Sequence, residues 1–208
     1  MVEVGELLAE LARRGVTDAS GETLDRATYS SDASLYRVVP LVVVRPRSSD
    51  ELLAILDVAG VSGTPLTMRG AGTSIAGNAV GPGIVVDTSK HLHRILSIDP
   101  AARTAVVEPG VVHAQLQGRL TPLGLRFGPD PSTHTRCTIG GMIGNNACGS
   151  RALGYGRTVD NVAALKVALG TGAVVTDGAA PPELAELVDL NLGHVRPAFG
   201  QFGRQVSG

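Results

Sequence analysis

The clustering of glycine is the feature that most restricts how this chain can fold. Glycine occupies 27 of the 208 positions, and residues 70–83 and 140–156 are especially rich in it. Glycine weakens helices and strands, but it allows positive φ angles and close approach of the backbone to another group. The glycines do not recur at every third position, which excludes a collagen-like chain. We therefore expect two segments whose backbone lies close against something else, such as a ligand.

Composition and charge exclude several other classes of protein. The net charge of −1 gives no bulk attraction to nucleic acid or to an anionic membrane. Trp is absent, and three Tyr and three Phe are too few to form a stacking platform for bases. The N-terminus lacks the pattern of a secretory signal, and no apolar run reaches the length of about 18 residues that predicts a membrane span. We expect a cytoplasmic protein, with peripheral attachment to the inner membrane left open.

The remaining sequence predicts short strands mixed with helices. Apolar spacing predicts helices over residues 4–14 and 111–120, and a last helix over 182–192. Ser48 followed by Glu51 is a capping signal for a further helix that ends near Gly60. Since strands and helices do not alternate as a regular βαβ repeat, the expected fold class is α+β. Strands are expected at residues 41–45, 65–69, 83–87, 95–98 and 104–108, and as a pair at 161–169 and 173–176.

The first glycine-rich segment does not fit either of the common phosphate-binding motifs. A dinucleotide-binding fingerprint requires a third glycine where this sequence has Ile75. Gly72 and Gly77 have the spacing of a nucleoside-triphosphatase loop, but Asn78 stands where that motif requires Lys. Two hypotheses remain for this segment. It is a tight connection between strands, or it is a loop whose successive backbone N–H groups point at a phosphate.

The second segment reads Cys137-Thr-Ile-Gly-Gly-Met-Ile-Gly-Asn-Asn-Ala-Cys-Gly149. A plain core helix is unfavourable here, because each glycine costs about 1 kcal/mol relative to alanine. The cost is understandable if a flat ring system lies against the backbone and bonds to its amides. Arg136 and Arg151 flank the segment, and either can offset negative charge or bind a carboxylate, although a surface role is equally compatible. The spacing of His and Cys predicts no metal site and no iron–sulfur ligation.

Taken in order, these motifs resemble the FAD-binding domain of the vanillyl-alcohol oxidase and p-cresol methylhydroxylase type. The resemblance rests on Arg69-Gly-Ala-Gly-Thr-Ser-Ile-Ala-Gly77 and on the second segment, with Leu41-Val-Val-Val-Arg-Pro46, Val107-Glu-Pro-Gly110, Gly154-Tyr-Gly156 and Asp160-Asn-Val162 around them. It covers about residues 28–178. Within the family, the chain is most similar to the branch of the glycolate oxidase D-subunit, D-lactate dehydrogenase and D-2-hydroxyglutarate dehydrogenase.

The resemblance implies which residues contact FAD. In the family the first loop holds the FAD diphosphate, and the second region lines the ribityl chain and the isoalloxazine ring. Thr73 occupies the place where some relatives carry a covalently linked His, which implies non-covalent FAD here. The residues implied for the diphosphate are Arg69, Gly70, Ala71, Gly72, Thr73, Ser74, Gly77 and Asn78. Those implied for the ring and ribityl chain are Pro129, Ser132, Ile139, Gly140, Gly141, Asn146, Ala147, Gly149, Tyr155 and Gly156.

The resemblance also implies an architecture and an activity. A small parallel sheet with helices is expected to pack on a larger mixed sheet, with FAD between them. Residues 1–27 are expected as an N-terminal helical extension, and residues 28–208 as an FAD-binding domain that is incomplete at its C-terminus. The implied reaction moves a hydride from the α-carbon of a small-molecule 2-hydroxy acid to the flavin. The substrate domain, and an iron–sulfur domain or subunit, would then be partners outside this chain, which alone is expected to be inactive; its catalytic residues stay unassigned.

Two alternatives to this function remain open from the sequence. The chain can belong to another flavoenzyme of the same fold, similar to the UDP-N-acetylenolpyruvoylglucosamine reductase that uses NADPH. It can also be a nucleotide-binding module with no catalytic role. Reduction of the flavin by NADPH would identify the first, and failure to take up FAD would identify the second.

Overall fold

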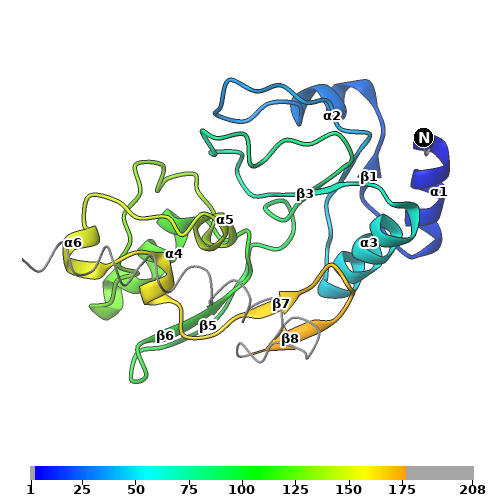
Figure 1. Cartoon of the computed structure of the whole chain (residues 1–208). Coiled ribbons are helices and arrows are strands. Elements are labelled where there is room, and N and C mark those ends of the chain that lie inside the picture. Colours follow the sequence, from blue (N-terminus) through cyan, green and yellow to red (C-terminus); the bar gives the residue numbers. More distant parts are fainter. Residues whose placement is uncertain (1–2, 177–208) are drawn as a thin grey trace, which may run out of the picture. The chain divides into compact units, whose positions relative to one another are not determined.

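The computed structural model describes residues 3–176 (Figure 1). The chain divides into two compact units. The first comprises residues up to Val162 together with Gly170–Gly172, and the second contains Ala163–Leu169 and the chain from Ala173 onward. The helix expected at residues 182–192 lies outside the described residues. No described helix is long and apolar enough to cross a membrane.

The first unit contains a four-stranded sheet in the order β1-β2-β4-β3. Strands β2 (Val42–Val44), β4 (Ile84–Asp87) and β3 (Leu66–Arg69) are parallel, and the short β1 (Ala19–Ser20) pairs antiparallel with β2. Every residue of β2 and β4 is buried. Apart from Asp87 at the end of β4, these central strands consist of Val and Ile, as is usual for parallel strands covered on both faces.

Helices α1 (Val4–Arg13) and α3 (Ser49–Ser62) pack on each other and share one apolar core with the sheet (Figure 1). The capping signal is confirmed, because Ser48 Oγ accepts a hydrogen bond of 3.1 Å from the backbone N–H of Glu51. Helix α3 runs two residues past Gly60 and stops at Gly63, which has a φ of 63°. Residues 1–27 also supply β1 and most of α2 (Thr23–Thr28), a helix that the sequence did not predict; the boundary at residue 27 stays a prediction.

A second apolar core lies further along the same unit. The antiparallel strands β5 (Ile95–Asp99) and β6 (Thr104–Val107) pack with α4 (His113–Leu120) and α5 (Ile139–Gly144) around Val111. This part of the unit is completed by the short elements η1 (Thr121–Leu123), α6 (Ala152–Tyr155) and η2 (Thr158–Asn161). Among the described residues, the second sheet is therefore a two-stranded antiparallel one.

The second unit is described from its hairpin of β7 (Lys166–Ala168) and β8 (Val174–Thr176), which pair antiparallel as the sequence predicted. The first strand was expected from residue 161 but begins only at Lys166, and Asn161 ends the short helix η2. Between these strands, Gly172 has a φ of 83°. A mixed sheet, antiparallel pairs and separate helices together confirm the α+β fold class.

Candidate functional site

The first glycine-rich segment is the loop that follows β3. Its backbone takes positive φ angles at Gly72 (66°) and Gly77 (78°), which side chains with a Cβ rarely adopt. A Cβ on Gly77 would also lie 2.6 Å from the ring of Tyr36, so this position has no space for a larger residue. Ser74 Oγ accepts hydrogen bonds from the N–H groups of Ala76 (3.2 Å) and Asn78 (3.3 Å), and these bonds fold the loop back on itself.

The loop presents a run of backbone donors. Within residues 3–176, no acceptor bonds the N–H groups of the five successive residues 71–75. Some donors of Arg69 are already used inside the protein, because its Nη1 donates to the carbonyls of Ser31 and Ala79 at 3.0 Å each. Its guanidinium also lies over the ring of Tyr29. Arg69 therefore anchors the start of the loop, while the N–H groups of residues 71–75 are left without an acceptor among the described residues.

The second glycine-rich segment forms the short helix α5, in spite of its composition. The buried Thr138 precedes the helix, and its Oγ1 accepts from the N–H of Gly141 at 3.3 Å. Gly140 packs against Pro109, where a Cβ would come within 2.7 Å of the proline Cβ. The glycines of α5 therefore allow close packing inside the protein as well as access to the backbone.

Most backbone N–H groups of the second segment already donate hydrogen bonds to acceptors within the protein. Those of residues 139–142 and 145–147 bond to protein acceptors, among them the carbonyls of Val111 and Pro109 at 2.8 Å each. Within the described residues, the N–H groups of residues 148–151 have no such acceptor. Backbone donors for a ligand are therefore found after α5 rather than within it.

The two segments meet across a single cleft of about 250 Å³. Asn78 Nδ2 donates to Asn145 Oδ1 at 3.0 Å, and Gly70 lies so close to Thr138 that a Cβ would collide with Thr138 Oγ1. The predicted residues that line the cleft are Gly70, Ala71, Gly72, Thr73, Ser74, Asn78, Gly141 and Ala147.

The other predicted residues do not line the cleft. Ile139 is buried in the second core, and Pro129 uses its carbonyl to accept from His113 Nε2 at 2.8 Å. Asn146 has a φ of 45°, and its Oδ1 accepts from the N–H of Val159 at 3.1 Å. The remaining residues in this group are Arg69, Gly77, Ser132, Gly140, Gly149, Tyr155 and Gly156.

Several lining residues were not predicted from the sequence. Thr138 was detectable, because a threonine directly before Ile139 is in the position of a helix N-cap. The others lie within or near the two glycine-rich segments, or are brought to the cleft by the tertiary fold. These residues are Met68, Ile75, Ala76, Ala79, Pro131, Thr133, Cys137, Met142 and Asn145. No group of three or more His, Cys, Asp or Glu side chains able to hold a metal ion occurs within the part of the chain described here.

Comparison with solved structures assigns the fold. The chain is similar to alkyldihydroxyacetonephosphate synthase, with a TM-score of 0.73 and 21% identity over 86% of this chain and 36% of that one. It is also similar to the BBE-like 1 protein of Physcomitrella patens, with a TM-score of 0.71 and 23% identity over 85% of this chain and 38% of that one. It therefore has the α+β fold of these proteins.

Comparison with protein families is more specific. The chain belongs to the FAD binding domain family, which it matches over residues 40–178, and FAD is its cofactor. It is 40% identical to the D-2-hydroxyglutarate dehydrogenase of Escherichia coli over 86% of this chain and 18% of the relative. It is 38% identical to the glycolate oxidase subunit GlcD of Bacillus subtilis over 74% of this chain and 33% of the relative. The chain thus spans only about a fifth to a third of the length of these relatives.

Proposed function

We propose that FAD binds without a covalent bond across the cleft between the two glycine-rich segments. The run of free N–H groups at residues 71–75 carries this proposal, because successive unpaired amides form a concave site for phosphate oxygens. Gly70 and Gly141 line the cleft without a side chain, which leaves their backbone open to a cofactor. A Cβ at either position would also meet Thr138 Oγ1, so these glycines allow the two segments to pack closely as well.

The diphosphate would lie on residues 70–78, and the ribityl chain and ring would lie toward residues 138–149. Thr138 positions the two segments, because its Oγ1 holds Gly141 and its side chain abuts Gly70. The contact from Asn78 to Asn145 ties the far end of the first loop to the end of α5. Both links keep the two segments at a fixed separation before the cofactor enters, which reduces the ordering cost of binding.

The whole protein that contains this segment is proposed to oxidise a 2-hydroxy acid. The supporting observation is that the relatives at 37–40% identity include enzymes named D-2-hydroxyglutarate dehydrogenase, glycolate oxidase subunit GlcD and D-lactate dehydrogenase. Bound FAD supplies the hydride acceptor. Binding of the substrate and removal of its proton would come from parts beyond this chain, and an iron–sulfur domain or subunit is a further proposed partner. A cytoplasmic location is part of the same proposal.

The visible spectrum of the purified chain tests the cofactor proposal. Flavin absorption that moves to the supernatant on acid precipitation is the expected result, because the cofactor is not covalently attached. Replacing Gly72 by Val should weaken FAD binding, since Gly72 has a φ of 66° and lines the cleft. Gly124→Val is the matched control, because Gly124 has a similar φ of 67° but lies outside the cleft. A colourless protein that takes up no added FAD would contradict the proposal.

The activity proposal needs the whole protein. Dye reduction with D-2-hydroxyglutarate, D-lactate or glycolate should proceed with the whole protein and be weak or absent with the chain alone. Reduction by NADPH in place of these acids would favour the alternative reductase. Neither result changes the expectation for FAD uptake, so the two proposals fail separately.

A further inference from the structure

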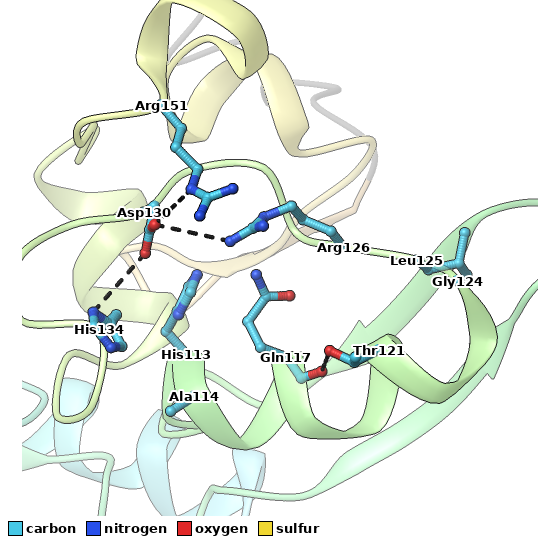
Figure 2. A pocket seen from close by; sticks show the side chains of 10 residues that line it. All are labelled: His113, Ala114, Gln117, Thr121, Gly124, Leu125, Arg126, Asp130, His134 and Arg151. Atoms are coloured by element: carbon cyan, nitrogen blue, oxygen red, sulfur yellow. Dashed lines mark hydrogen bonds and ion pairs between the residues drawn. The ribbon is translucent and has the colours of Figure 1, made fainter.

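A second pocket of about 640 Å³ lies beside α4 and shares no lining residue with the cofactor cleft (Figure 2). Helix α4 and the turn after it form one side, and residues 126–134 with Arg151 form the other. The residues that line it are His113, Ala114, Gln117, Thr121, Gly124, Leu125, Arg126, Asp130, His134 and Arg151.

Two guanidinium groups in this pocket share one carboxylate. Arg151 Nε donates to Asp130 Oδ2 at 2.9 Å, whereas Arg126 Nη2 stays 3.8 Å from the same oxygen, too far for a hydrogen bond. Figure 2 shows both side chains reaching into the same space above His113 and Gln117. Within residues 3–176, no acceptor bonds the Nη groups of Arg151 or any donor of Arg126. The pair therefore has a surplus positive charge and several unused donors.

His134 also approaches the carboxylate, with its Nδ1 3.9 Å from Asp130 Oδ1, and the lining apart from these four residues carries no formal charge. Gln117 is already occupied, since its side-chain amide exchanges two hydrogen bonds of 3.0 Å with the backbone of Phe127. His113 is buried, its Nε2 donates to the Pro129 carbonyl, and burial lowers the pKa of its imidazole, which is therefore uncharged at neutral pH. Ala114 and Leu125 add apolar surface. The pocket thus places two guanidinium groups next to an uncharged, partly apolar surface against which a carbon chain can pack.

We propose that this pocket binds a small organic acid, whose carboxylate is held by Arg126 and Arg151. A planar carboxylate matches the fork of a guanidinium group and can accept two parallel hydrogen bonds from it. The carboxylate of the ligand would supply hydrogen-bond acceptors for the guanidinium group of Arg126, which makes no hydrogen bond to Asp130. The neutral surface favours an acid with a short carbon chain over an inorganic anion. The site does not depend on FAD, since none of its residues lines the cofactor cleft.

Titration of the full chain with lactate, methyl lactate and inorganic phosphate by calorimetry or NMR tests this proposal. Lactate should bind, and methyl lactate, which has no carboxylate charge, should bind far more weakly. Arg126→Gln and Arg151→Gln should each weaken lactate binding by about tenfold or more, because charge-assisted hydrogen bonds are lost. Arg126→Lys, which keeps the charge but lacks the fork, should give an intermediate affinity.

Arg136→Gln is the matched control, because Arg136 is exposed and does not line the pocket. It should leave lactate affinity unchanged. FAD uptake should be retained by all of these variants, which shows that they fold and separates this proposal from that for the cofactor. Equal lactate affinity in the wild type and both glutamine variants would overturn the assignment. So would phosphate binding as tight as lactate binding, or methyl lactate binding as tight as lactate.

Discussion

Adding one methyl group at Gly70 tests whether direct contact holds the two glycine-rich segments together. The φ of Gly70 is not positive, so alanine is allowed by the backbone and the effect is steric. The new Cβ would collide with Thr138 Oγ1, while Thr138 Cβ at 3.4 Å and Cγ2 at 3.5 Å would be ordinary contacts. Thr138 is only 2% exposed, so its hydroxyl cannot turn away into solvent.

The expected cost follows from these contacts. Forcing an extra methyl group into a packed site costs about 1–3 kcal/mol. Replacing glycine by alanine restricts the unfolded chain and returns about 0.4–1 kcal/mol. Gly70→Ala should therefore lower the free energy of unfolding by about 1–2 kcal/mol and weaken FAD binding, since Gly70 lines the cleft. Gly118→Ala is the control, because nothing lies within 4 Å of its Cβ position in α4 and the change should be neutral or stabilising.

A double-mutant cycle measured by urea unfolding gives the decisive result. Thr138→Ala alone should cost about 1 kcal/mol, because its Oγ1 caps α5. In the double variant, the alanine at position 138 has no Oγ1 to clash with the new Cβ. The loss in free energy of unfolding should therefore be smaller than the sum of the two single losses by about 1 kcal/mol or more. Costs that add to within about 0.5 kcal/mol would show that the two residues do not touch, and would refute the reasoning.

Three further predictions follow from single contacts. Ser48→Ala should lower the free energy of unfolding by about 1 kcal/mol in urea titrations, because the cap of α3 is lost, whereas Ser49→Ala should have little effect. Tyr29→Phe should cost about 1–3 kcal/mol, since the tyrosine hydroxyl donates to the buried Asp87 at 2.6 Å; unchanged stability would contradict this role. Burial lowers the pKa of His113 from its ordinary 6.5, so the unfolded chain takes up the proton first and stability should fall as pH drops below 6.5. His113→Gln should remove that slope in unfolding curves recorded at successive pH values.

The sequence predicted elements whose signals are local. The central strands were visible because parallel strands with two buried faces must be apolar throughout, and the start of α3 was visible in Ser48. The segments that form the cleft were visible because glycine accumulates where backbone approaches another group. These signals identified both walls of the cleft, which Gly72 and Gly141 line together; that this cleft holds FAD stays a proposal.

Contacts between distant segments could not be predicted in the same way. Glycine has two roles in α5. Gly140 packs directly against Pro109 inside the protein, whereas Gly141 lines the cleft. Composition alone cannot separate these roles, because both require the absence of a Cβ. The sequence indicated that Arg151 can bind a carboxylate, but it did not group this residue with Arg126 and Asp130, because Asp130 and Arg151 are 21 residues apart in sequence and only the fold brings them together.

The strip of residues 130–134 separates the two pockets and determines how they can influence each other. Pro131 and Thr133 line the cofactor cleft, whereas Asp130 and His134 line the second pocket, beside α4. The strip is held at both ends, since the Asp130 carbonyl lies against Gly149 and the His134 carbonyl accepts from the N–H of Ala114 at 3.0 Å. Because both ends of the strip are anchored, electrostatic coupling between the pockets is favoured over a shift of this backbone. If FAD lies toward residues 138–149 as proposed, an acid bound at Arg126 and Arg151 would add negative charge beside it and should disfavour negative charge on the reduced cofactor.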